Sequence, residues 1–376
     1  MIYLDNAATT MPKPPQVTDA VVAAMNICGN PSRGAYEASL EGLRCMLQAR
    51  VALARLFGVE NPLWVAFTMN ATAALNIAVA GIKGHILTTA AEHNSVLRPI
   101  CRQGNYTVVP LDRLGRLDLD LVEQSIRPDT EALVMTHASN LTGNVYDIHG
   151  AGQLCRQKGI KLIVDAAQTA GLLPLDMAAD GITALCFSGH KSLYGPQGTG
   201  GICLNAGQYQ PEALVIGGSG SESYSPLHPQ AMPDALEAGT QNAHGIAGLL
   251  AGVEYIDRMD GRCFMEADRQ ARRFIEGVRQ LPGITLYGDV DAALRTPVVA
   301  LNLQGQDGSE VADKLNEHYG IAVRAGAHCA PLMHETLGTV RTGAVRFSFS
   351  HFNTTAETDR AIQAIEEISG YRGERG

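Results

Sequence analysis

Short apolar segments rich in β-branched residues alternate with longer amphipathic segments through about the first 205 residues. Several short segments are almost entirely apolar, as is typical of strands buried on both faces of a parallel sheet. The strands predicted in this way are 64–69, 85–89, 106–111, 132–136, 161–164, 184–188 and 201–204. Helical patterns such as 71–80 and 149–158 lie between them. This alternation predicts an α/β fold with a mostly parallel sheet.

The pattern differs at the two ends of the chain. A long helix is predicted over 36–57, where apolar residues recur every three or four positions and Gly58 follows as a stop signal. After about Gly245 the predicted elements are helices 246–259 and 263–280, strands 284–287, 298–303 and 345–350, and a final helix 356–368. Fewer strands with helices between them predict a smaller α+β domain. We therefore expect a large domain over 12–255, and a small C-terminal domain over 256–376 that also includes residues 1–11.

The length and charge of the chain exclude some classes of function. A chain of 376 residues exceeds the size at which one compact core stops growing, which favours two domains. Lys and Arg number 29 against 38 Asp and Glu, a formal net charge of −9, and there is no basic block. Binding to nucleic acid or to an anionic membrane is therefore not expected. We find no signal-peptide pattern and no apolar run of about 18 residues, so we expect a cytoplasmic protein.

The eight cysteines are scattered and form no C-x-x-C pair, which argues against a zinc ribbon or a disulfide scaffold. Most are expected to be small buried residues, as Cys186 and Cys203 are within apolar strands. Cys329 differs, because it lies in the Gly- and Pro-containing loop 324–331 beside Arg and His, where a thiol can be exposed and its thiolate favoured. His328, Cys329 and His334 lack a fourth ligand with suitable spacing, so no metal site is predicted.

The segment 187–201, FSGHKSLYGPQGTGG, carries the strongest chemical signal. Lys191 follows a buried strand and precedes a glycine-rich stretch through which the backbone can pass close to a ligand. A lysine in such a place is a candidate for a lowered pKa and Schiff-base chemistry. An ordinary exposed lysine is the alternative, and the glycine run alone lacks the phosphate-loop pattern.

Polar residues follow other predicted strands. Asp165 ends the strand 161–164, where a carboxylate can hold a pyridinium nitrogen protonated; an N-cap for the next helix is the alternative. Thr72 lies where the strand 64–69 runs into a helix, a natural phosphate site or an ordinary helix cap. His93 offers an imidazole at the same edge of the sheet. Together with Lys191, these residues favour a pyridoxal phosphate site.

Seven motifs make the resemblance to a known family specific. They are YLDNAATT at 3–10, EHN at 92–94, SNLTG at 139–143, VDAAQ at 164–168, SGHK at 188–191, EAGT at 237–240 and RAGAHCA at 324–330. In this order and spacing the chain resembles the cysteine desulfurase and selenocysteine lyase family. These are fold type I pyridoxal phosphate enzymes of the class V aminotransferase group, so the resemblance implies that fold and pyridoxal 5′-phosphate as cofactor.

The resemblance also implies roles around the cofactor ring. Lys191 would bind the cofactor covalently and move protons. Asp165 would pair with the ring nitrogen and Gln168 with the ring hydroxyl. His93 would stack on the ring and assist proton transfer, and Asn140 would lie near the ring oxygen and the substrate carboxylate.

Further positions would hold the phosphate and the substrate. The phosphate would be bound by the Ala71 N–H, Thr72, Ser188, His190 and, from the partner subunit of a homodimer, Thr240. Arg346 would clamp the substrate carboxylate with its bidentate fork. Cys329 would be the nucleophile that takes the sulfur.

The implied reaction converts L-cysteine into L-alanine and leaves a persulfide on Cys329. The alternatives are a selenocysteine lyase that takes L-selenocysteine, another class V aminotransferase or β-lyase, and an inactive partner that retains the fold. There are two departures from the family. In the turn Met69-Asn70-Ala71-Thr72, many relatives have a second hydroxyl residue before the Thr. The segment 331–339 lacks the long insertion of one branch of the family and is unlike the best-known forms of the other. The sulfur-acceptor protein and the pathway, whether iron–sulfur clusters, tRNA thiolation or another, stay open at this point.

Overall fold

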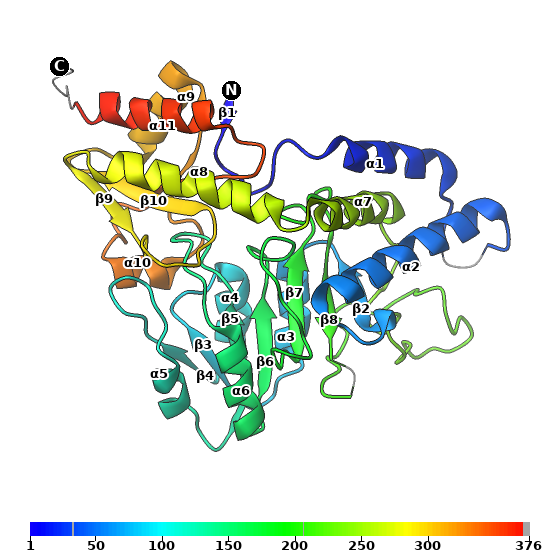
Figure 1. The fold of residues 1–376 in the computed structure, drawn as a ribbon. Coiled ribbons are helices and arrows are strands. Elements are labelled where there is room, and N and C mark those ends of the chain that lie inside the picture. Colours follow the sequence, from blue (N-terminus) through cyan, green and yellow to red (C-terminus); the bar gives the residue numbers. More distant parts are fainter. Residues whose placement is uncertain (32–33, 206, 371–376) are drawn as a thin grey trace.

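The computed structural model describes residues 1–31, 34–205 and 207–370. Its centre is a seven-stranded sheet with the order β2-β8-β7-β6-β5-β3-β4 (Figure 1). The strands are β2 (Val65–Thr68), β3 (His85–Thr89), β4 (Tyr106–Val109), β5 (Thr130–Thr136), β6 (Lys161–Asp165), β7 (Ala184–Ser188) and β8 (Gly200–Leu204). Strand β8 is antiparallel to β2 and β7, and the other neighbours are parallel. The predicted α/β fold with a mostly parallel sheet is confirmed.

Both faces of this sheet are buried, which explains the nearly continuous apolar strands. Ala132 and Val134 of β5 face a core built with helices α3 (Ala71–Ala80) and α4 (Asn94–Gln103). Leu133 and Met135 face the opposite core. That core receives side chains from α2 (Glu37–Phe57), α5 (Leu119–Gln124), α6 (Ile148–Lys158) and α7 (Ala243–Met259).

The predicted long helix is α2, and its C-terminal end follows the sequence signal. Tyr36 is its N-cap, and Gly58 ends it in the left-handed conformation with φ 65°. Helix α1 (Pro15–Ile27) precedes it and packs with α7, and the short η1 (Pro62–Trp64) follows. None of the described helices is long and apolar enough to cross a membrane.

The C-terminal third contains an antiparallel sheet of order β12-β13-β10-β9. The elements of the C-terminal third are α8 (Arg262–Arg279), β9 (Ile284–Tyr287), β10 (Val298–Leu303), α9 (Gly308–Tyr319), β11 (Ile321–Ala322), β12 (Arg324–Gly326), α10 (Pro331–Leu337), β13 (Ala344–Ser348) and α11 (Thr355–Ile368). Helices α8 and α11 lie along this sheet, with Phe274 and Ile365 in the same core as Phe347 (Figure 1). Strands β11 and β12 have two and three residues, too short to show an alternating pattern.

The N-terminus joins the C-terminal part. Strand β1 (Ile2–Tyr3) pairs in parallel with β11, and Leu4 is buried in the core of the antiparallel sheet. The expected domain boundary at 255/256 falls inside α7, which continues to Met259. The division into 12–255 and 256–376 with 1–11 stays a prediction.

Candidate active site

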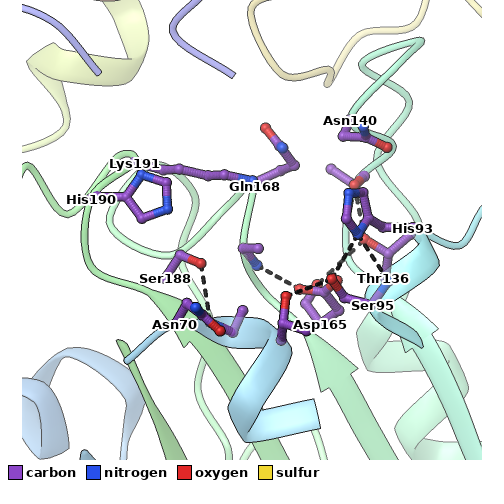
Figure 2. A pocket seen from close by; sticks show the side chains of 14 residues that line it. Asn70, His93, Ser95, Thr136, Asn140, Asp165, Gln168, Ser188, His190 and Lys191 are labelled. Atoms are coloured by element: carbon purple, nitrogen blue, oxygen red, sulfur yellow. Dashed lines mark hydrogen bonds between the residues drawn. The ribbon is translucent and has the colours of Figure 1, made fainter. Parts of the chain in front are cut away.

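A cavity of about 230 Å³ lies at the carboxyl ends of β5, β6 and β7, beside the first turns of α3 and α4 (Figure 2). Carboxyl ends of parallel strands are where α/β sheets bind ligands. Predicted residues that line it are Ala71, Thr72, His93, Asn140, Asp165, Gln168, Ser188, His190 and Lys191. The structure thus brings together polar groups that are spread over about 120 positions of the sequence.

Lys191 lies in the loop after β7 and projects toward the cavity. Burial lowers the pKa of its ammonium to about 8, although the Asp165 carboxylate acts in the opposite direction. The backbone of this loop is held by the N-terminal segment, since Thr10 Oγ1 donates to the Lys191 oxygen at 2.8 Å and Thr10 N donates to the His190 oxygen at 3.2 Å. With a pKa of about 8, about a tenth of Lys191 is the uncharged amine at pH 7, which is the form that attacks a carbonyl.

Asp165 is the last residue of β6 and is 4% exposed. Burial raises the pKa of its carboxyl group, while a hydrogen bond from Ala167 N to Oδ1 at 2.9 Å counteracts this. The alternative that Asp165 caps a helix is wrong, because the residues that follow it form turns. A buried carboxylate that lines a cavity is suited to a ligand carrying an N–H⁺ group.

The entrance to α3 supplies donors for an anion. Asn70 caps the helix through Oδ1, which accepts from Ala73 N at 2.9 Å, so the cap alternative holds for this residue. Ala71 N donates to Ser188 Oγ at 3.2 Å, and the Thr72 and Ser95 hydroxyls are 2.7 Å apart. The Ala71 N–H and the nearby hydroxyls at the start of this ten-residue helix fit a phosphate group.

His93 is the N-cap of α4, and its orientation is fixed. Its Nδ1 accepts from Ser95 N at 3.0 Å, so the neutral ring carries its proton at Nε2. Burial, assisted by the charge of Lys191, lowers the pKa of His93 to about 4. The flat, uncharged ring thus faces the cavity at neutral pH. Burial likewise lowers the pKa of His190 to about 4.

The loop that carries Cys329 is docked on the cavity rim through its backbone. Asn140 Nδ2 donates to the His328 oxygen at 2.7 Å, and Asn94 N donates to the Cys329 oxygen at 2.8 Å. His328 and Cys329 both have positive φ, 48° and 55°, a conformation unusual for side-chain-bearing residues. The Cys329 side chain is exposed and does not line the cavity. The backbone is thus fixed while the thiol stays accessible.

Asn140, which holds the Cys329 loop, is also hydrogen-bonded to Arg346. Arg346, on β13, donates from Nη1 to the Asn140 oxygen at 3.0 Å and from Nη2 to Asp5 Oδ1 at 2.6 Å. Gly143 allows the Asn140 loop to pass β10, because a Cβ there would lie 2.6 Å from the Val298 oxygen and the residue has φ 78°. Arg346 is 2% exposed and is not a lining residue of the cavity.

Thr240 is the one predicted phosphate-binding residue that does not line this cavity, although it lines a neighbouring pocket together with Met69 and Ala73. It lines a separate groove of about 520 Å³ together with Arg50 and Glu237. Arg50 and Glu237 form a buried bidentate ion pair with N–O distances of 2.6 and 2.7 Å. The site of this chain therefore forms without Thr240.

The sequence interpretation gave no role in the site to several lining residues: Asn70, Ser95, Thr136, Ala138 and Ala167. Thr136 ends β5, so its position after a buried strand was an available signal. Ser95 follows His93 at the start of α4, where a hydroxyl near a phosphate site is expected. Among the described residues no three His, Cys, Asp or Glu side chains are grouped as metal ligands.

Comparisons with known proteins agree with this geometry. The family model described as aminotransferase class-V matches residues 2–361. The chain is 32% identical to a protein named probable cysteine desulfurase from Methanothermobacter thermautotrophicus, over 98% of this chain and 95% of that protein. It is 30% identical to a protein of the same name from Pyrococcus abyssi, over 98% and 94%.

A solved structure is similar over nearly the whole chain. The apo cysteine desulfurase from Thermococcus onnurineus NA1 superposes with a TM-score of 0.89 at 29% identity, covering 98% of this chain and 94% of that one. The family match, the relatives and the fold therefore lead to one conclusion: the chain belongs to the aminotransferase class-V family and, within it, to the cysteine desulfurases.

Proposed function

We propose that this protein is a pyridoxal phosphate-dependent cysteine desulfurase that converts L-cysteine into L-alanine and receives the sulfur on Cys329 as a persulfide. The observation that carries the proposal is the docking of the Cys329 loop. Hydrogen bonds from Asn94 and Asn140 hold it at the rim of the cavity that contains Lys191 and Asp165. Sulfur abstraction needs a thiol on a loop at the rim of such a cavity, whereas transamination alone does not.

The residues present fit pyridoxal 5′-phosphate. When bound, the cofactor supplies an aldehyde for the amine and a ring that accepts the electron pair released at Cα. The Asp165 carboxylate would hold the ring N–H, and Gln168 would bind the ring hydroxyl. Helix α3, through the Ala71 N–H and Thr72, would bind the phosphate together with the side chains of Ser188 and His190.

Lys191 serves as the proton carrier. Its lowered pKa, about 8, lets it hold or release a proton near neutral pH. The neutral Lys191 amine takes the proton from substrate Cα, and the resulting ammonium later gives that proton back to the substrate. His93 carries its proton at Nε2 and is placed to pass it within the cavity.

Cys329 completes the reaction as the sulfur acceptor. Arg346 and Asn140 hold the substrate α-carboxylate, which directs the substrate thiol toward the loop. The Cys329 thiolate forms an S–S bond as the substrate C–S bond breaks, and the electron pair of that bond stays on carbon. Protonation of the carbon then gives alanine, and Cys329 keeps the persulfide. Because Cys329 is exposed, an acceptor protein can reach it afterwards.

Assembly as a homodimer is part of the proposal. Leu43, Leu47 and Leu63 are exposed large apolar residues and line the same groove as Thr240. Covering this groove with a second copy would bury them and allow Thr240 to reach the phosphate of the partner subunit. A fully active monomer in analytical ultracentrifugation would remove Thr240 from the site. We also propose a cytoplasmic location.

The direct test incubates the purified holoenzyme with L-cysteine and a thiol reductant. We expect sulfide and alanine in equal amounts. Pyruvate and ammonia in place of alanine would identify a β-lyase, and alanine formed rapidly from L-selenocysteine alone would identify a selenocysteine lyase.

A further inference from the structure

Arg346 has contacts that the proposed reaction does not explain. Its guanidinium donates from Nη1 to the backbone oxygen of Asn140 and from Nη2 to Asp5 Oδ1. Nε has no hydrogen-bond partner among the described residues. A planar guanidinium held at two nitrogens has a fixed orientation. Asp5 and Asn140 together therefore decide where its remaining N–H groups point.

Asp5 is itself held firmly beside the strand that carries Arg346. It forms a parallel bridge with Ser348, two residues after Arg346 on β13. Ser348 N donates to the Leu4 oxygen at 2.7 Å, and Asn6 Nδ2 donates to the Ser348 oxygen at 2.9 Å. The side chain of Asp5 is 20% exposed. Its carboxylate is thus placed by the fold, so little conformational entropy opposes the ion pair.

The charges directly around Arg346 favour an anion. Arg324 lies directly opposite Arg346 in the β12–β13 ladder, which places two guanidinium groups on one face of the sheet. Burial lowers the pKa of Arg346, and the Asp5 carboxylate counteracts this. Two guanidinium groups against one Asp5 carboxylate leave this face of the sheet positive, which favours an anion such as an α-carboxylate.

We propose that Asp5 is a positioning residue for substrate recognition: it orients the Arg346 guanidinium so that its free N–H groups receive the α-carboxylate of an amino acid. The inference rests on the proposed function, because that function gives Arg346 its role. Asp5 binds one Nη only, so three of the five N–H groups, including Nε–H, have no partner in the contacts described above. Asp5 thus acts through Arg346 and need not leave it when substrate binds.

The test measures carboxylate recognition without sulfur chemistry. The holoenzyme is titrated with L-alanine and with ethylamine, which lacks the carboxylate, and the visible spectrum of the cofactor reports binding. In Asp5→Asn, which keeps the size and one acceptor oxygen but removes the charge, we expect alanine to bind about tenfold more weakly. Ethylamine binding should change by less than about twofold. In the Arg346→Gln background, Asp5→Asn should add no further loss.

Tyr3→Phe is the matched control. It removes hydrogen bonds from Tyr3 OH to the Asp5 and Thr9 oxygens in the same segment but changes no charge. Alanine affinity should stay close to that of the wild type. An equal loss in Tyr3→Phe and Asp5→Asn would contradict the proposal, because packing of the segment would then explain both.

Other outcomes separate the two proposals. Unchanged or tighter alanine binding in Asp5→Asn would overturn the role of Asp5 and identify its carboxylate as a competitor of the substrate. If Asp5→Asn does not fold, Asp5→Glu serves instead: it keeps the charge but shifts the guanidinium, so wild-type affinity for alanine would overturn the proposal. A wild type that binds alanine but releases no sulfide from cysteine contradicts the proposed function alone.

Discussion

The two nucleophiles of the proposed reaction, Lys191 and Cys329, lie in contrasting environments. Lys191 is enclosed by groups from the sheet, α3 and the N-terminal segment, and burial changes its pKa. Cys329 is exposed on a loop whose hydrogen bonds to the rim go through its backbone. The difference follows from their tasks, since the lysine serves one bound cofactor and the cysteine must reach both a substrate and an acceptor protein.

The comparison shows two ways of preparing a reactive group. Enclosure restricts the movement of the Lys191 side chain and lowers its pKa. Backbone hydrogen bonds fix the place of Cys329 and leave its side chain exposed. Changes at Lys191 should therefore affect every step, whereas changes at the loop should affect sulfur transfer alone. Four predictions test this, from the largest effect to the smallest.

Lys191→Ala should abolish both covalent cofactor binding and turnover. Borohydride treatment should fix the cofactor to the wild type and not to the variant, as measured by mass spectrometry. We expect turnover to fall at least about 1,000-fold, or about 4 kcal/mol of barrier. A variant that kept more than a tenth of the wild-type rate would show that Lys191 is not the proton carrier.

Cys329→Ser should stop sulfur release and spare the cofactor. The shape is kept, but an alkoxide is far harder to form than a thiolate, so sulfide should fall at least about 100-fold, roughly 2.7 kcal/mol of barrier. The spectral change on adding L-cysteine should persist. Sulfide release at the wild-type rate would remove the persulfide from the mechanism.

Cofactor uptake by the cofactor-free protein should depend on pH through Lys191. Only the neutral amine attacks the aldehyde, so below a pKa of about 8 the uptake rate should rise about tenfold per pH unit and level off above it. Stopped-flow absorbance between pH 6 and 10 gives the profile, within the range where the fold is intact by circular dichroism. A rate still rising steeply at pH 10 would mean that enclosure does not lower this pKa.

Asn94→Pro tests the backbone tether of the cysteine loop. Asn94 is the first residue of α4, where proline is tolerated, and His93 before it already has φ −69° and ψ 154°, as proline requires. The change removes the N–H that donates to the Cys329 oxygen. One hydrogen bond of about 1 kcal/mol predicts a two- to tenfold rise in alkylation of Cys329 and a similar fall in sulfide.

Two references accompany this variant. Asn94→Ala keeps the N–H and should behave as the wild type. The exposed Cys101 serves as an internal standard in peptide-resolved mass spectrometry. Equal alkylation of Cys329 in both variants would show that the loop is held by other contacts.

Much of the fold and the cavity could be predicted from the sequence, because the signals depend on residues that are neighbours in the chain. Strands buried on both faces must be nearly all apolar, so the pattern predicts the parallel sheet. Polar residues placed directly after such strands meet at one edge, which gave Asp165 and Lys191 their place. The C-terminal end of α2 is equally local, since Gly58 ends the helix in the left-handed conformation.

The sequence by itself thus determined the parallel sheet and the polar groups at its carboxyl edge, because both depend on neighbouring residues. Only the tertiary structure decided the contacts of Asp5 with Arg346 and of Asn94 with Cys329, which are 341 and 235 positions apart. Neither contact leaves a local pattern: one needs the N-terminal segment beside β13, and the other uses a backbone N–H that every residue except proline has.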